Sequence, residues 1–304
     1  MRLTINTQKN YQRGIALVVV LWMLVLLTVM AGSYSATMRT ETLSTARQVQ
    51  AAQARALAEA GVWLAAKGLL QPTTAQLWQT DGSLETVPYD DSVIYIQVQD
   101  EAGKIDLNTA QREILLGLLQ STNISGDQAE SITSAILDWR DRDNLIRIKG
   151  AEDPDYQVAN LDYDAKDGPF NSIEELRRVL GMTEAIFKKI RPALTIHSHL
   201  PGINPLVAVR EALLALPGIE TMDVDAFILN REDESSISMT GVDKRFLSST
   251  QNKTFLISSE GISGDSKVRL DIVILLKRNK KLPFTVLSWQ EGLPARMIVE
   301  IVES

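Results

Sequence analysis

The chain has 304 residues, of which 45% are hydrophobic and 23% are charged, and its formal net charge is -7. This length and apolar content suffice for one or two hydrophobic cores, so the composition is that of a folded protein and not of a disordered one. The acidic balance argues against a general nucleic-acid binder, and the absence of cysteine excludes disulfides, thiol catalysis and thiolate metal sites.

A long apolar segment begins at Gly14, and no charged residue falls between Arg13 and Arg39. As a helix with a rise of about 1.5 Å per residue, this segment can cross a hydrocarbon core of roughly 30 Å. Arg2 and Lys9 also precede it and no acidic residue does, which predicts that the N-terminus stays in the cytoplasm. We therefore expect a single-pass membrane protein whose main body is extracytoplasmic.

Two cleavage sites can be read in this region. The small residues 31–33 follow the apolar segment as in a secretory signal, but the helical pattern continues through them, which a discarded signal does not need. Arg13 and Gly14 before an apolar helix resemble the type IV prepilin class, in which a membrane peptidase cuts after the glycine. This resemblance predicts processing between Gly14 and Ile15, with the helix kept on the mature protein.

Two positions differ from the common prepilin pattern. Ile15 stands where the first mature residue is commonly Phe, and Val19 stands where the fifth is commonly Glu. A buried carboxylate is costly unless it is paired, and in a pilin-like filament its partner is the N-terminal amine of a neighbouring subunit. A chain of this size without that glutamate resembles the protein K family of minor pseudopilins in type II secretion systems.

The resemblance implies a specific role and specific partners. Members of this family sit at the tip of a short periplasmic pseudopilus, which they cap and help to initiate during export of folded proteins. The implied partners are the minor pseudopilins I and J, the other pseudopilins of the pseudopilus and the prepilin peptidase. The implied location is the inner membrane of a Gram-negative bacterium, with the main body in the periplasm, and no nucleic acid is expected as a partner.

From Ser35 to about Leu70 the sequence is rich in helix formers and has no proline, which predicts one continuous rod with the membrane helix. A loop containing Pro72, Gly82 and Pro88 is expected next. Residues with alternating or β-branched patterns then predict strands of one antiparallel sheet packed on the rod, at 93–99, 254–259, 267–277 and 285–289.

About 150 residues separate the first predicted strand from the later ones, and a loop of that length is not expected. Asn108 and Asn204 each precede a helical pattern as an expected cap, and residues 172–190, with a turn at Gly181, resemble a helix-hairpin-helix. We predict an α+β fold: a pilin-like N-terminal transmembrane helix packed on a small antiparallel sheet, with a large inserted all-helical domain containing helix-hairpin-helix-like repeats. The expected divisions are a prepilin-type leader at 1–14, the transmembrane helix at 15–37, a periplasmic helix and first strand at 38–103, the inserted domain at 104–250 and C-terminal strands at 251–304.

Nine carboxylates and only five basic residues lie between Asp138 and Asp167. A solvated acidic loop explains such a run, because charge runs usually lie at the surface. A hard cation such as Ca²⁺, which takes six to eight oxygen ligands, would relieve the repulsion as well. Leu145 and Ile146 occupy positions where an EF-hand needs an oxygen ligand and a glycine, which excludes that motif. Resemblance to the protein K family favours calcium, with these expected ligands: Asp141, Asp143, Glu152, Asp153 and Asp155.

The remaining motifs are weaker. The two histidines, His197 and His199, are interpreted as an exposed pair in a linker, and the sequence has no phosphate loop, nucleophile elbow or paired acid–base motif, so we expect no enzyme. A membrane-anchored helix-hairpin-helix DNA receptor is the alternative function, with Lys188, Lys189 and Arg191 as contacts. The acidic balance and the lack of paired glycines at the turn argue against it.

Overall fold

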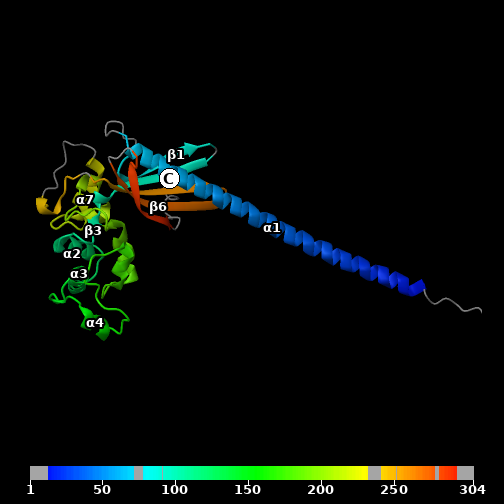
Figure 1. The fold of residues 1–304 in the computed structure, drawn as a ribbon, viewed down its shortest axis with the longest axis horizontal. Helices are drawn as coiled ribbons and strands as arrows, with labels where there is room; N and C mark the ends of the chain where they lie inside the picture. The colour runs from blue at the N-terminus through cyan, green and yellow to red at the C-terminus, as the bar shows by residue number, and fades with distance from the viewer. Residues whose placement is uncertain are drawn as a thin grey trace, which may run out of the picture.

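The computed structural model describes residues 13–71, 78–90, 92–231, 241–250, 252–277 and 281–292. Residues 1–12 of the expected leader at 1–14 lie outside the described residues. Residues 293–304, at the end of the expected C-terminal strand region, lie outside them as well. Figure 1 shows three parts: a long helix, a sheet packed on one end of it, and a region of short helices beside the sheet.

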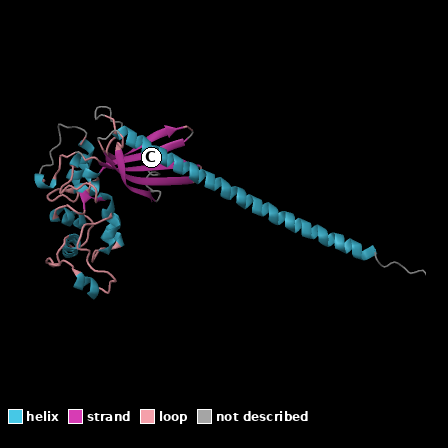
Figure 2. Cartoon of the chain, viewed as in Figure 1, coloured by secondary structure: helices cyan, strands magenta, loops and turns pink. Residues whose placement is uncertain are grey.

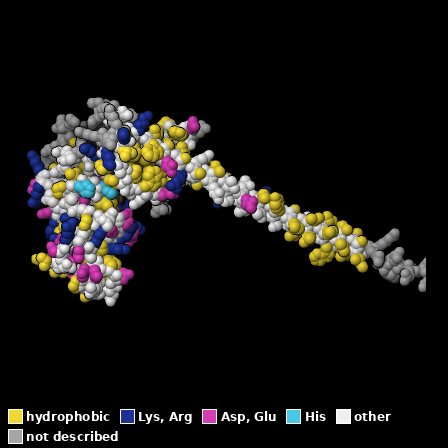
Figure 3. All heavy atoms as spheres, in the orientation of Figure 1, with side chains coloured by type: hydrophobic (Ala, Val, Ile, Leu, Met, Phe, Trp, Pro, Cys, Tyr) yellow, Lys and Arg dark blue, Asp and Glu magenta, His cyan; other side chains and the backbone are white. Residues whose placement is uncertain are grey.

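Helix α1 runs without interruption from Arg13 to Leu69, which confirms the predicted continuous rod (Figure 1). Along residues 15–35 its apolar side chains are exposed, and they form the hydrophobic end of the rod in Figure 3. Its last turns bury one stripe of small and aliphatic residues at helical spacing. This stripe contains Ala54, Ala58, Val62, Ala65 and Leu69.

The sheet has the order β1-β2-β5-β6-β7, and each neighbouring pair is antiparallel. Its strands are β1 (Asp81–Tyr89), β2 (Ser92–Asp100), β5 (Thr254–Ser263), β6 (Ser266–Leu276) and β7 (Phe284–Gly292). The four predicted strands correspond to β2, β5, β6 and β7, which confirms one antiparallel sheet. In Figure 2 the sheet lies against the last turns of α1.

Strand β1 was wrongly expected to be loop. Pro88 is tolerated because β1 is an edge strand, where one side of the backbone needs no ladder partner. Gly82 adopts φ 85° in an irregularity of the β1–β2 register between Asp81 and Leu84. Both residues are compatible with an edge strand, although in the sequence they read as turn residues.

The core of the body lies between α1 and one face of the sheet. Alternate residues of β2, β5 and β6 point toward the helix, including the fully buried Ile96, Ile257 and Ile272. Gly261 lets the backbones approach closely, because a Cβ there would lie 2.2 Å from the Ala54 carbonyl oxygen. The sheet therefore buries one face on the rod and turns the other face toward the inserted region.

The chain between β2 and β5 forms a region with its own hydrophobic cluster, whose members lie between Ile105 and Leu247. Its α-helices are α2 (Arg112–Gln120), α3 (Gly126–Arg140), α4 (Asp153–Val158), α5 (Glu184–Ile190), α6 (Arg210–Leu213) and α7 (Thr221–Asn230). Its 3-10 helices are η2 (Glu101–Gly103), η3 (Ile173–Arg178), η4 (Arg191–Ala193), η5 (Pro205–Val207) and η7 (Lys244–Phe246). The predicted α+β fold with a helical insertion is confirmed.

The insertion differs from the prediction in two details. It is not wholly helical, because β3 (Ile105–Asp106) and β4 (Leu194–Thr195) form a parallel pair too short to give a periodic pattern. Asn204 caps η5 as expected, its Oδ1 accepting from Leu206 N at 3.2 Å. Asn108 does not cap α2, since its side chain instead exchanges two hydrogen bonds with the Phe170 backbone, at 2.7 and 3.0 Å.

Candidate metal centre and anchor helix

The acidic residues gather where α3 ends and α4 begins, at the end of the inserted domain far from the sheet (Figure 1). Helix α3 ends at Arg140, and the next residue, Asp141, donates its backbone N–H to Leu137 O at 3.2 Å. Glu152 precedes the first turn of α4, and its backbone N–H donates to Asp155 Oδ2 at 3.0 Å. These two helix ends fix the positions from which the carboxylates project.

Three carboxylates converge at this point: Glu152, Asp153 and Asp167 each place an oxygen atom within 4.8 Å of the others. Glu152 is 3% exposed, and both of its carboxylate oxygens are buried with no hydrogen-bond partner among the described residues. Asp167 Oδ1 and Asp141 Oδ1 are buried without such a partner as well. Unpartnered buried carboxylate oxygens are costly, so this donor set fits a hard cation with oxygen ligands.

The electrostatics of the cluster point the same way. Burial raises the pKa of Glu152 to about 7, and the charges of Asp138, Asp167, Asp141 and Asp153 add to the shift. Burial and the neighbouring carboxylates, Asp153 first, also raise the pKa of Asp167. A cation among these groups would favour their ionised forms and so oppose both shifts.

The expected ligands are not all placed alike. Glu152 and Asp153 belong to the convergent group, and Asp141 is near enough for its charge to help raise the pKa of Glu152. Asp143 is exposed and its Oδ1 accepts from Leu145 N at 3.0 Å, while Asp155 accepts from Glu152 N. Neither of these two contributes an oxygen to the convergent group.

Asp167 was not among the expected ligands. It closes the same run of carboxylates, but it lies well beyond the segment that carries the family resemblance. Its backbone has φ 53°, a left-handed conformation that Asp tolerates better than most residues. Because this turn places Asp167 beside α4, residue spacing alone could not identify it.

Asp138 has a structural role beside the cluster. It is fully buried, and its oxygens accept from Arg147 Nη1 at 2.6 Å and from Ala151 N at 2.9 Å. The next residue, Trp139, packs its ring against Tyr156 at 5.7 Å and against Phe170 at 6.3 Å. This aromatic packing joins the end of α3 to α4.

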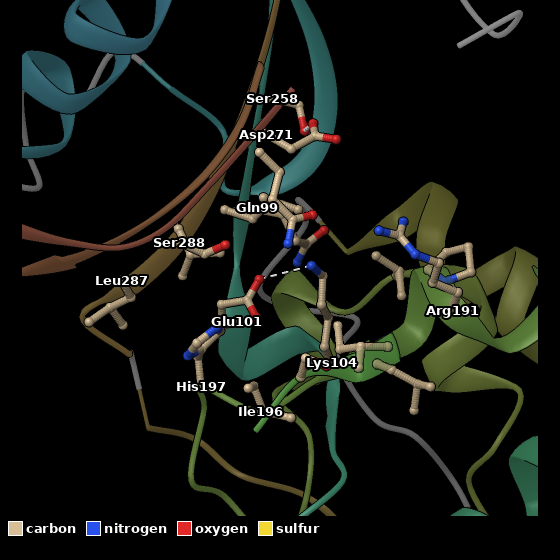
Figure 4. Close-up of a pocket in the computed structure, with 18 of the residues that line it drawn as sticks. Gln99, Glu101, Lys104, Arg191, Ile196, His197, Ser258, Asp271, Leu287 and Ser288 are labelled. Atoms are coloured by element: carbon tan, nitrogen blue, oxygen red, sulfur yellow. Dashed lines mark hydrogen bonds and ion pairs between the residues drawn. The ribbon is translucent and has the colours of Figure 1, made fainter. Parts of the chain in front are cut away.

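The histidine pair is placed differently from the prediction. His199 is exposed with φ 54°, but His197 is half-buried, and burial lowers the pKa of its imidazole. His197 lines a cleft of about 490 Å³ between the outer face of the sheet and the inserted domain (Figure 4). A buried ion pair from Lys104 Nζ to Glu101 Oε1, 2.8 Å long, forms part of the wall.

The three cations expected to contact DNA all have protein partners. Lys189 Nζ donates to Thr122 O at 3.0 Å, and Arg191 Nη2 lies 3.3 Å from Glu174 Oε1. Lys188 Nζ lies 3.7 Å from Glu184 Oε1. All three side chains therefore contact groups of the protein itself, which does not favour the DNA-receptor alternative.

The anchor helix is the second candidate functional element. Among the described residues, Ile15–Leu69 is long and apolar enough to cross a membrane. Val19 lies in its apolar part and is 52% exposed, and the first acidic residue of α1 is Glu41. The expected processing position between Gly14 and Ile15 falls in the first turn of α1, and residues 1–12 of its leader lie outside the described residues.

Comparison with known proteins places these features in context. The family model for the type II secretion system (T2SS), protein K, matches residues 95–199. Type II secretion system protein K of Klebsiella pneumoniae is 31% identical over 228 residues, covering 67% of this chain and 69% of that protein. The protein of the same name from Pectobacterium carotovorum subsp. carotovorum is 28% identical over 233 residues, covering 68% and 70%.

The fold is also similar to that of a solved structure. The similar chain is part of the crystal structure of the GspK-GspI-GspJ complex from the enterotoxigenic Escherichia coli type 2 secretion system, and the TM-score is 0.58. The match covers 84% of this chain and 100% of that chain at 20% sequence identity. At this identity the likeness shows the fold alone.

Proposed function

The chain belongs to the type II secretion system protein K family, and on this premise we propose that it caps a short periplasmic pseudopilus and helps to initiate it during export of folded proteins. It is a minor pseudopilin, with α1 as candidate anchor and the sheet as the body on that helix. The observation that carries the capping proposal is the position of the inserted domain, which lies beyond the sheet at the end opposite the anchor (Figure 1). A further subunit stacked there would meet this domain.

Val19 supplies a chemical reason for the same placement. In a helical stack each buried glutamate needs the amine of an adjacent subunit, because an unpaired carboxylate in apolar surroundings is costly. A subunit with Val19 gives up that pairing, but its own amine at Ile15 can still pair with the glutamate of a partner. Such a subunit can join a filament at one end without extending the other.

The proposed partners are the minor pseudopilins I and J. Protein K of enterotoxigenic Escherichia coli is named in a complex with GspI and GspJ, and this chain shares its fold. We place the other pseudopilins of the filament on the membrane side of these three minor pseudopilins. We place the apolar part of α1 in the inner membrane, with the N-terminus of the chain in the cytoplasm and the body in the periplasm. The three leader cations support this orientation.

Processing by the prepilin peptidase completes the proposed biogenesis. Cleavage after Gly14 would leave Ile15 as the first mature residue, since glycine offers an unhindered backbone to the enzyme. Gly14→Arg should leave the precursor uncut. Mass spectrometry of the membrane protein reads this directly, and a mature N-terminus at Met1 or after Ser33 contradicts the assignment.

Calcium is the proposed ion of the acidic cluster. Glu152, Asp153 and Asp167 would hold it with Asp141 beside them, since the unpartnered buried oxygens of Glu152, Asp167 and Asp141 suit a hard cation. The ion would supply positive charge between the end of α3 and the start of α4. Its proposed role is to stabilise the inserted domain, with no part in a reaction.

Cross-linking tests the capping proposal. The chain has no cysteine, so one introduced cysteine gives an unambiguous product. Leu43 on α1 is 60% exposed and suits this purpose. In assembled pseudopili, Leu43→Cys should cross-link to cysteine variants of the minor partners at one end. Self-cross-linking along the shaft would contradict the proposal.

A further inference from the structure

The cleft between the outer face of the sheet and the inserted domain is large enough to hold a ligand. Its volume of about 490 Å³ falls within the range of roughly 300–1,000 Å³ that is typical of ligand-binding pockets. One wall is mainly the face of β2, β5, β6 and β7 that is turned away from α1, and the other is the inserted domain between Asn171 and Val209 (Figure 4). Among the described residues, neither the acidic cluster nor α1 contributes to its lining. The cleft is therefore a separate candidate site.

The charged side chains of the cleft are already paired with one another. Three cations and three carboxylates line it, and they form three ion pairs: Lys104 with Glu101 at 2.8 Å, Arg191 with Glu174 at 3.3 Å and Arg269 with Asp271 at 2.9 Å. His197 also lines the cleft, and burial lowers the pKa of its imidazole, so this ring is neutral near neutral pH. A charged ligand would find no unpaired opposite charge here, and burying a charge without a partner is costly. The cleft therefore favours an uncharged ligand.

The cleft offers neutral hydrogen-bonding groups from both walls. Several amide and hydroxyl side chains in its lining make no side-chain hydrogen bond to another described residue: Gln97, Ser288 and Gln290 from the sheet, and Asn171 and Ser172 from the inserted domain. A side-chain amide carries both donors and an acceptor, so it can pair with an amide group of a ligand. No aromatic ring is present in the described part of the lining, which does not favour ligands that bind by stacking, such as nucleobases.

Aliphatic side chains also line both walls. Leu256 and Val273 belong to the sheet, and Leu194 and Ile196 belong to the inserted domain. In an extended peptide, successive side chains point to opposite sides, so such a peptide can place apolar side chains on both walls at once. Its backbone N–H and C=O groups need partners when they are buried, and the neutral side chains of the lining can supply them. A peptide thus matches the apolar and the polar groups of the cleft together.

We propose that this cleft binds an uncharged, extended peptide segment of another protein, with aliphatic side chains at successive positions on both of its sides. The aliphatic side chains contact the two walls, and the backbone amides pair with the side-chain amides. The three ion pairs stay intact, because nothing in such a peptide competes for them. This binding site goes beyond the capping role and does not depend on it.

Calorimetry with a defined peptide tests the proposal. The protein is the full chain in phosphatidylcholine nanodiscs, with the heat from empty nanodiscs subtracted. The probe is the acetylated and amidated peptide Val-Ser-Val-Ser-Val, and its matched control has Asp in place of both Ser residues. The uncharged peptide should bind, and the charged one should bind at least about tenfold more weakly, because its carboxylates would be buried without partners. No binding of the uncharged peptide, or equal binding of both, would overturn the proposal.

Neighbouring positions on β7 test where the peptide binds. Leu287 lines the cleft and is 43% exposed, whereas the adjacent Val286 is 39% exposed and does not line it. Leu287→Asp places a charge in the cleft and should abolish binding of the uncharged peptide, and Val286→Asp should leave the binding unchanged. Melting temperatures check that both variants fold. Equal binding by the two folded variants would place the peptide elsewhere and overturn the proposal.

Gln97→Met gives a test that does not disturb the fold. It keeps a side chain of similar length and removes an amide that makes no hydrogen bond to another described residue. Binding of the uncharged peptide should weaken about two- to tenfold, the factor that corresponds to one hydrogen bond. Unchanged binding would contradict the proposed role of the side-chain amides.

A neutral sugar is the other occupant that the same experiment can detect. Maltose carries hydroxyl groups but no amide and no aliphatic side chain, so we expect it neither to bind nor to compete with the peptide. Displacement of the peptide by maltose, lost in Leu287→Asp and kept in Val286→Asp, would assign the cleft to a sugar and overturn the proposal.

Discussion

Gly261 is a single residue that sets the distance between the sheet and α1. A Cβ at this position would lie 2.2 Å from Ala54 O and 2.6 Å from Ala58 N, and both atoms are helix backbone that cannot rotate away. Gly261→Ala should lower the free energy of unfolding by about 1–3 kcal/mol, as overpacking usually does. Denaturant unfolding of a soluble fragment beginning at residue 38 measures it.

Gly126 provides the matched control for this substitution. It starts α3, and a Cβ there would meet no atom within 4 Å. Gly126→Ala should leave the free energy of unfolding unchanged or raise it by up to about 1 kcal/mol, because alanine restricts the unfolded chain. Equal destabilisation by the two substitutions would show that the close approach at Gly261 does not limit the packing.

Asp100 gives the body a predictable dependence on pH. It is 4% exposed at the end of β2, and burial raises its pKa to about 6 despite backbone N–H groups that donate to it. A carboxyl whose pKa is raised in the folded state contributes stability below its ordinary value of 3.8, and that contribution is lost as pH rises through about 6. Asp100→Asn should therefore raise the melting temperature at pH 8 and change it little at pH 4.

The comparison at two pH values makes the Asp100 prediction specific. In the wild-type protein, Asp100 Oδ1 accepts a hydrogen bond from Ala102 N at 2.8 Å. The side-chain oxygen of asparagine can accept the same bond, so the local fold is kept. Asp223→Asn is the matched control, because it removes a carboxylate from an exposed position on α7. If the substitution changes the melting temperature by the same amount at pH 4 and at pH 8, the prediction is wrong, because the pKa of Asp100 would then not differ between the folded and unfolded chain.

At the scale of elements, the acidic cluster connects α3 to α4, and calcium should stabilise this connection. A ligand that binds only the folded state at about 100 times its dissociation constant contributes roughly 2.7 kcal/mol. Chelator should lower the melting temperature of residues 38–304, and Glu152→Gln with Asp167→Asn should remove most of that sensitivity. Both replacements keep the side-chain volume, so they test charge and ligation.

Asp143 supplies the control for the calcium prediction. It belongs to the same acidic run, but it is exposed and lies outside the convergent group. Asp143→Asn should leave the response to chelator nearly intact. A melt that does not depend on chelator in the wild-type protein would return the cluster to the interpretation as a solvated loop.

The same elements show what the sequence could predict. Strands β2, β5 and β6 were predictable because their apolar residues alternate toward α1, and α1 because nothing interrupts its helix formers. Strand β1 was not, since Pro88 and Gly82 suit an edge strand and a turn equally well. Glu152 and Asp153 were predictable from a local run, but Asp167 required the turn that brings distant residues together.

At the scale of the whole molecule, the insertion can be removed without breaking the sheet. Asp100 of β2 pairs directly with Phe255 of β5, so both ends of the inserted region leave from neighbouring strands. The body and the insertion also have separate hydrophobic clusters. Deleting residues 104–250 with a short linker should therefore leave the body folded, which circular dichroism and a cooperative melt can check.

This deletion separates the two proposed causes of capping. If the bulk of the insertion obstructs a further subunit, its removal should loosen the restriction to one end, whereas Val19→Glu alone should leave the full-length chain at the tip, because the insertion still stands in the way. Combining both changes should give the most incorporation along the shaft, since the introduced carboxylate could then pair with a neighbouring amine. Leu43→Cys cross-linking in assembled pseudopili compares the variants. If Val19→Glu alone places the full-length chain along the shaft, the missing carboxylate, and not the inserted domain, determines the cap.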